Sequence, residues 1–91
     1  MKLESQARAE FLASYPAWEL QGEAISRTFA FRDFSEAVGF VTRVAMLAEV
    51  ADHHPDIDIR WNKVTLSLTT HHAGSLTQKD TDLAAKIETL L

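Results

Sequence analysis

The amino-acid sequence predicts an α+β fold, in which a four-stranded antiparallel sheet carries three helices packed on one face in the order α-β-β-α-β-β-α. Two pairs of short segments alternate apolar and polar side chains across tight turns, which is the pattern of β-hairpins. Three other segments repeat apolar residues every three or four positions, which is the pattern of helices with one buried face. Apolar helix stripes above an antiparallel sheet make the layers of an α+β domain.

The first half of the chain predicts a helix and a hairpin. Residues 5–14 place apolar side chains on one helix face, and Pro16 ends this helix because the residue before a proline is pushed out of helical geometry. Strands are expected over 17–21 and 24–32. Gly22 occupies the first turn position between them, as a type II′ turn prefers.

A long helix follows, and both of its ends carry signals. Asp33 is placed to cap free backbone amides, and Glu36 three positions later completes a capping-box pattern. Pro55 forces the preceding residue into extended backbone, so the helix is expected to end near Asp52 or His53. The face expected to pack on the sheet consists of Phe34, Ala37, Val38, Val41, Val44, Ala45 and Ala48.

The remaining segments predict a second hairpin and a last helix. Residues 56–61 and 64–69 alternate in character, and residues 62–63 form the tight connection between them. Thr77 is placed to cap the last helix, with Asp80 at the third position of the box. The buried stripe expected for this helix consists of Leu83, Ala84, Ile87, Leu90 and Leu91.

Composition limits the class of protein. Ninety-one residues form one domain, 1–91, with 46% hydrophobic and 24% charged residues, as in ordinary globular proteins. The net charge of −4 and the scattered basic residues argue against a nucleic-acid partner. The sequence has no cysteine, and no apolar run approaches the roughly 18–20 residues of a membrane span. We therefore expect a cytoplasmic protein with neither nucleic acid nor a membrane as partner.

The candidate chemistry lies in two histidine pairs. All four histidines of the chain occur as His53-His54 and His71-His72, each at the boundary of a predicted element. Histidine titrates nearest neutrality, so this clustering suits proton transfer, and the carboxylates that accompany it would support imidazolium acids. Those carboxylates are Glu49, Asp52 and Asp80. Glu49 is four positions before His53, on the same helix face if the last turn extends that far.

Other hypotheses remain open on the residues alone. His and Asp are zinc ligands, but there is no His-x-x-x-His or cysteine pair, and adjacent histidines seldom face one ion. A non-catalytic interaction domain is equally compatible, with Asp80 acting only as a helix cap and His72 as a loop residue. Trp18 and Trp61 are more typical of a core than of a ligand platform. The exposed strand edges of so small a sheet favour pairing across a dimer.

Taken together, the spaced residues resemble the signature of the pterin-4a-carbinolamine dehydratases. The signature runs as Glu49-x3-His53-His54-Pro55-x5-Trp61-x9-His71-x8-Asp80. The resemblance extends through residues 29–34, 39–45, 61–64, 76–80 and 83–84, and covers about residues 18–88. There are two departures, since Trp61 stands where many members have tyrosine and His72 replaces a common acidic residue.

The resemblance implies dehydration of 4a-hydroxytetrahydrobiopterin (pterin-4a-carbinolamine) to quinonoid dihydrobiopterin by histidine acid–base catalysis, with no metal and no other cofactor. It implies His54 as the base, His53 and His71 as acids, and Asp80 and Glu49 as the carboxylates that hold His71 or its neighbour protonated. Pro55 would shape the turn. The implied substrate-binding set is Trp18, His53, His54, Pro55, Thr70, His71 and His72.

The resemblance also implies a context for the activity. Members of this family form homodimers or homotetramers, and their usual role is tetrahydrobiopterin recycling for an aromatic amino-acid hydroxylase. Animal members also bind a homeodomain transcription factor, a partner that nothing in this sequence indicates.

Overall fold

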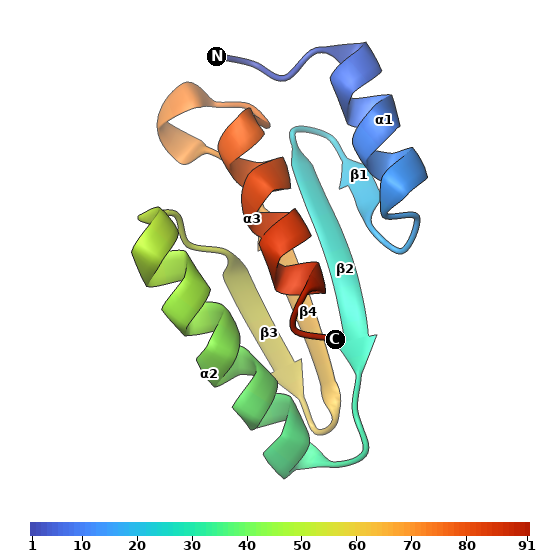
Figure 1. The fold of residues 1–91 in the computed structure, drawn as a ribbon, viewed down its shortest axis with the longest axis vertical. Coiled ribbons are helices and arrows are strands. Elements are labelled where there is room, and N and C mark those ends of the chain that lie inside the picture. Colours follow the sequence, from blue (N-terminus) through green and yellow to red (C-terminus); the bar gives the residue numbers. More distant parts are fainter.

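The computed structural model describes residues 1–91 and contains the predicted order of elements (Figure 1). A short 3-10 helix, η1, precedes the last helix. None of the helices combines the length and the apolar character that crossing a membrane requires. The elements are α1 (Ser5–Ser14), β1 (Glu19–Gln21), β2 (Ala24–Ala30), α2 (Phe34–Ala51), β3 (Asp56–Arg60), β4 (Lys63–Leu68), η1 (His71–Ala73) and α3 (Gln78–Glu88).

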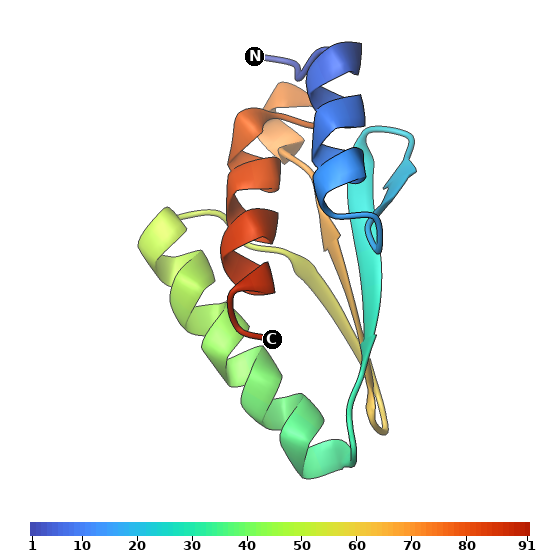
Figure 2. The same cartoon turned by 45° about the vertical axis from the view of Figure 1, so that its right-hand side comes forward.

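The four strands form one antiparallel sheet in the order β1-β2-β4-β3. Each predicted hairpin is present, and β2 pairs with β4 to join the two hairpins, with Ile25 opposite Leu68 and Phe29 opposite Val64. All three helices lie on one side of this sheet (Figure 2). The predicted α+β architecture is confirmed.

The second hairpin turns one residue earlier than expected. Trp61 has a left-handed φ of 49°, so it lies in the turn with Asn62, whereas Lys63 already pairs with Arg60 in the ladder. The prediction of a 62–63 connection, with Trp61 in the strand, is therefore wrong. The Asn62 side-chain amide donates to the Phe31 carbonyl at 2.8 Å, which secures the turn against the end of β2. This contact joins residues far apart in sequence, so strand alternation alone did not indicate it.

The long helix begins after the predicted Asp33 cap, but the capping box is not completed, because the Glu36 carboxylate accepts the Arg32 backbone N–H instead of that of Asp33. The Asp33 carboxylate accepts the Glu36 backbone N–H at 2.8 Å, and this hydrogen bond is the main reason that the pKa of Asp33 is lowered. At the other end, Ala51 is the last helical residue, and Asp52 takes left-handed backbone with φ 50°. The last helical turn does not extend to His53, so the condition under which Glu49 and His53 would share one helix face is not met.

The core lies between the inner face of the sheet and the helices. From α2 it receives Ala37, Phe40, Val44 and Ala48, whereas Phe34, which was expected in this stripe, is exposed. Val38 and Ala45 are also exposed, and Leu91 extends beyond α3 into solvent. From the other elements the buried apolar residues include Trp18, Ile25, Phe29, Val64, Leu66, Leu68, Leu76, Leu83, Ala84 and Ile87.

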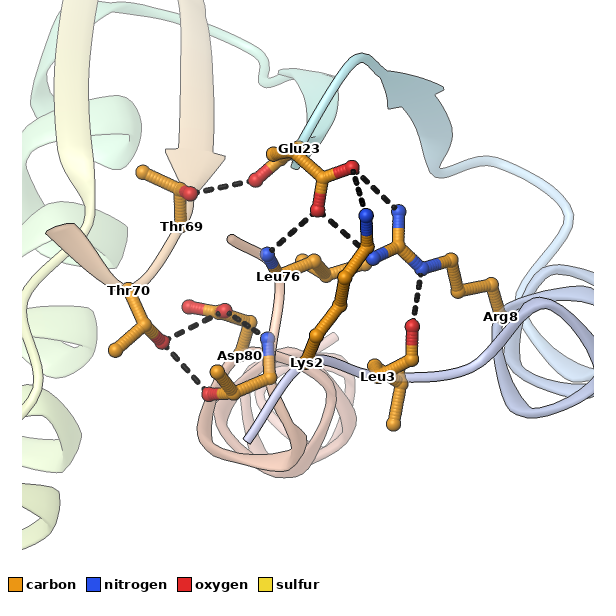
Figure 3. Close-up of polar contacts among 9 residues, drawn as sticks. Lys2, Leu3, Arg8, Glu23, Thr69, Thr70, Leu76 and Asp80 are labelled. Atoms are coloured by element: carbon orange, nitrogen blue, oxygen red, sulfur yellow. Dashed lines mark hydrogen bonds and ion pairs between the residues drawn. The ribbon is translucent and has the colours of Figure 1, made fainter. Parts of the chain in front are cut away.

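The N-terminal segment is fixed to the rest of the domain by Glu23, which lies in the turn between β1 and β2 (Figure 3). Its carboxylate accepts two hydrogen bonds from the Arg8 guanidinium, at 2.8 and 3.3 Å, and lies 3.5 Å from Lys2 Nζ. It also accepts the Leu76 backbone N–H at 3.2 Å. The Arg8 hydrogen bonds, followed by the Leu76 N–H, lower the pKa of Glu23 to about 2.

Phe40 is the least exposed aromatic residue of the core, at 1%. Its ring centroid lies 4.7 Å from that of Phe29 and 4.8 Å from that of Phe31. We expect Phe40→Ala to lower the free energy of unfolding by about 3–5 kcal/mol, because it leaves a cavity that the neighbouring rings cannot fill. Urea denaturation would measure this loss. The matched variant Phe34→Ala, which truncates an exposed ring of the same helix, should lose less than half as much.

The lowered pKa of Glu23 predicts a specific acid dependence of stability. Because the folded-state pKa lies below the ordinary 4.5, the ionised carboxylate stabilises the fold above that value, and this stabilisation is lost as the pH falls toward about 2. Glu23→Gln should therefore be less stable than the unsubstituted chain at neutral pH, with the difference shrinking below pH 4.5. Urea denaturation across this range would test it. A difference independent of pH would contradict the assignment, since the Asp33 contribution is common to both proteins.

Candidate active site

The buried carboxylate of Asp80 joins three segments at one end of the domain. Its Oδ2 accepts the Thr77 backbone N–H at 2.9 Å and the Thr70 hydroxyl at 2.9 Å (Figure 3). Its Oδ1 is hydrogen bonded to Nε2 of His53. The side chain is completely buried, so these donors replace water around the carboxylate. Asp80 thus fastens the start of α3 to the end of β4 and to the α2–β3 connection.

His53 is the histidine that the structure places in contact with this carboxylate. Its side chain is 11% exposed, and the left-handed Asp52 turns the chain out of α2 so that the ring reaches α3. The expectation that Asp80 holds His71 or its neighbour is corrected here, because the carboxylate contacts His53 instead. The hydrogen bond through Nε2 fixes the orientation of the ring. Nδ1 is left as the ring nitrogen without a protein partner.

His54 and Glu49 form a second, exposed pair. Nε2 of His54 lies 2.5 Å from Oε2 of Glu49. The side chains are 56% and 76% exposed, so water competes with this contact and the pair contributes little to stability. Glu49 was expected beside His53 and instead lies beside His54.

The other histidine pair lies in η1, after the end of β4. His71 was expected at the boundary of the last strand, and the structure ends that strand at Leu68 and places His71 at the start of η1. Both His71 and His72 are exposed, and the turn closes through the Gly74 N–H donating to the His71 carbonyl at 3.0 Å. His71 directly follows Thr70, whose hydroxyl is bonded to Asp80. The two histidine pairs are therefore joined through Thr70 and Asp80.

Two further members of the expected binding set, Trp18 and Thr70, are buried. Trp18 is buried in the core, edge-on to Phe11 and Phe29, and its indole N–H donates to Glu88 at 2.9 Å. It therefore presents no surface to a ligand, and the expectation that it borders the substrate is corrected. Thr70 is buried too, and its hydroxyl is occupied by Thr77 and Asp80.

Pro55 is partly exposed and lies directly after His54. Beside η1, a cavity of about 240 Å³ is lined by Met1, Thr70, His72, Ala73, Thr77, Gln78 and Lys79.

Metal ligation has no support in the side-chain arrangement. No group of three or more His, Cys, Asp or Glu side chains is placed to hold an ion. His53 and His54 engage separate carboxylates rather than a common point.

Two residues of the surrounding network were missed from the sequence. Arg8 lies in α1 and Glu23 in the β1–β2 turn, and the Glu23 carboxylate, paired with Arg8, accepts the backbone N–H of Leu76. No local pattern signals an ion pair between residues so far apart. Their charges became informative only when the fold placed the β1–β2 turn beside α1.

The chain matches known proteins over nearly its whole length. The family model for pterin 4 alpha carbinolamine dehydratase matches residues 1–90. A protein of Acidobacterium capsulatum, named provisionally as a pterin-4-alpha-carbinolamine dehydratase, is 56% identical over 99% of this chain and 98% of its own. A protein of a Roseiflexus species with the same provisional name is 57% identical over 90% of this chain and 88% of its own.

Solved structures agree with these sequence matches. A protein from Brucella melitensis described as a transcriptional coactivator/pterin dehydratase superposes with a TM-score of 0.93 at 35% identity, covering 99% of this chain and 98% of that one. A pterin dehydratase-like protein identified as a RuBisCO assembly factor in the alpha-carboxysome superposes with a TM-score of 0.69 at 25% identity, covering 81% and 88%. By its sequence and its fold, this chain belongs to the pterin-4-alpha-carbinolamine dehydratase family.

Proposed function

We propose that this protein is a hydro-lyase that dehydrates 4a-hydroxytetrahydrobiopterin to quinonoid dihydrobiopterin, as a step in tetrahydrobiopterin recycling. Membership of the dehydratase family supports the substrate class. The observation that carries the proposal is the His53 imidazole, which a fully buried carboxylate orients at one end of the domain. An oriented imidazole with one nitrogen free is suited to proton transfer with a bound substrate.

The reaction requires one proton to be supplied and one to be removed. The bond between C4a and the hydroxyl oxygen breaks, and hydroxide is a poor leaving group unless an acid protonates it to water. A base removes the proton on N5, and the N5 electrons form the double bond to C4a. Both transfers are general acid–base steps, for which histidine is the usual side chain.

In this proposal His53 and His71 supply the acid, and His54 is the base. Asp80 orients the His53 ring, because its hydrogen bond occupies Nε2 and leaves Nδ1 to face the substrate. Glu49 makes the corresponding contact with Nε2 of His54. The proposed substrate contacts are His53, His54, Pro55, His71 and His72, with Thr70 acting through Asp80.

A second candidate is an interaction module that retains the scaffold without the reaction. The similarity to a pterin dehydratase-like RuBisCO assembly factor favours keeping this alternative, because that protein shares the fold. The two functions are separated by whether the purified chain accelerates the dehydration.

The same proposal includes self-association, in the cytoplasm, as a homodimer or homotetramer. Strand β3 is at the edge of the sheet, so one side of its backbone lacks a strand partner. Ile57 and Ile59 lie opposite the buried Leu66 and Val64, on the helix side, yet are 40% and 38% exposed. A second copy would cover these side chains. A functional link to an aromatic amino-acid hydroxylase also belongs to this proposal.

The proposed catalysis predicts that the histidine variants have a lower kcat. We expect His53→Ala and His71→Ala to lower kcat for 4a-hydroxytetrahydropterin dehydration by about 10²- to 10⁴-fold, the usual contribution of a general acid or base. Asp80→Asn should also lower kcat, because its amide nitrogen would replace one acceptor oxygen. Stopped-flow absorbance with purified protein would measure these rates. If the unsubstituted chain is no faster than the spontaneous reaction, the enzyme proposal is wrong and the interaction module is favoured.

The proposed association predicts that charge on the edge strand separates the copies. Sedimentation velocity should show the unsubstituted chain as a dimer or tetramer, and Ile57→Lys combined with Ile59→Lys as a folded monomer. The lysines would carry charge into the surface that the second copy covers. A monomeric unsubstituted chain at the highest soluble concentration would contradict the proposal, and circular dichroism would establish that the variant remains folded.

A further inference from the structure

We infer that Glu23, held by Arg8, is a positioning residue for the loop that carries His71, and that the N-terminal segment thereby supports the site. This inference rests on the proposed dehydration for its consequence in catalysis. Figure 3 shows the contacts that lead to it.

The loop that carries His71, residues 70–75, is called the His71 loop. The residues on either side of it, Thr69 and Leu76, are both hydrogen bonded to Glu23. On the strand side, the Thr69 hydroxyl donates to the Glu23 backbone carbonyl at 2.5 Å. On the helix side, the Leu76 backbone N–H donates to the Glu23 carboxylate at 3.2 Å. The residues immediately before and after the loop are therefore held by the backbone and by the side chain of the same glutamate.

The carboxylate is itself held in place by a closed ring of four hydrogen-bonded links. Leu76 donates to Glu23, and Glu23 accepts from Arg8. Nε of Arg8 then donates to the Leu3 carbonyl at 2.7 Å. The Leu3 N–H returns to the Leu76 carbonyl at 2.8 Å, so both polar groups of the Leu76 backbone are bound within the ring.

The burial pattern makes these anchors important for His71. Residues 71–74 are all exposed, so no core packing locates them. Within the loop the backbone hydrogen bonds are local, with the Ala73 N–H donating to Thr70 and the Thr70 N–H donating to Ser75, and only the buried Thr70 hydroxyl reaches outside it, to Asp80 and Thr77. The position of the His71 ring relative to the rest of the site is therefore set by Thr70 and by the two ends of the loop that Glu23 holds.

A purely structural role for Glu23 makes a different prediction. If the glutamate only ties the N-terminal segment down, its loss lowers stability and leaves the folded enzyme as active as before. If it positions the loop, the folded enzyme loses turnover, because a displacement of about 1 Å in a catalytic group can cost on the order of 10²-fold in rate.

The test compares Glu23→Gln and Thr69→Val with the matched control Glu36→Gln. Glu36, at the start of α2, has nearly the same exposure, since its side chain is 41% exposed against 39% for Glu23. It likewise accepts one backbone N–H, from Arg32, and lies near a guanidinium, that of the same Arg32. It touches nothing in the His71 loop. Dehydration kinetics and hydrogen exchange at the Leu76 amide would be measured under conditions where all variants are folded.

We expect kcat to fall about 10- to 100-fold in Glu23→Gln, with KM changed less than kcat, and Leu76 exchange to accelerate. Thr69→Val should show a smaller loss of the same kind, and Glu36→Gln neither effect. Equal kcat in Glu23→Gln and Glu36→Gln would overturn the inference. An inactive unsubstituted chain would overturn the proposed function instead, and in that case unchanged Leu76 exchange in Glu23→Gln would overturn the anchoring role as well.

Discussion

The enclosed charge of Asp80 is the constraint on which this end of the structure depends. A carboxylate removed from water is costly unless donors surround it, and here a backbone N–H, a hydroxyl and an imidazole do so. Those donors come from the start of α3, the end of β4 and the connection after α2. A shift of any one of these segments breaks a hydrogen bond to the buried carboxylate, so satisfying Asp80 also positions the candidate site.

Capping and chemistry are combined in this one side chain. From the sequence, a plain helix cap and a catalytic role for Asp80 stood as alternatives. The structure shows that they use different oxygens, because Oδ2 completes the capping box with Thr77 while Oδ1 faces His53. The start of α3 therefore provides a rigid mount for the carboxylate. In the proposed reaction, the Asp80 carboxylate both stabilises the start of α3 and orients the His53 imidazole.

Much of the fold could be predicted because its determinants are local. Strand alternation, the caps at Asp33 and Thr77 and the apolar stripes specify each element from neighbouring residues alone. The site was harder, since its pairings cross the fold. Glu49 and His53 have the spacing of helical partners, yet the left-handed Asp52 ends the helix and exchanges that partner for Asp80. The sequence indicated candidate residues for the site, but it did not indicate which carboxylate contacts which ring.

The difference in exposure between the adjacent His53 and His54 rings has a consequence for proton exchange with the solvent. Asp52 is left-handed, and Pro55 favours extended backbone at the residue before it, where neighbouring side chains point in opposite directions. One imidazole is thus enclosed at 11% exposure and the next is open at 56%. A ring in open water can renew its proton between turnovers, whereas an enclosed ring keeps its geometry. Two identical side chains, adjacent in sequence, are given these unlike properties by a single left-handed residue and a proline.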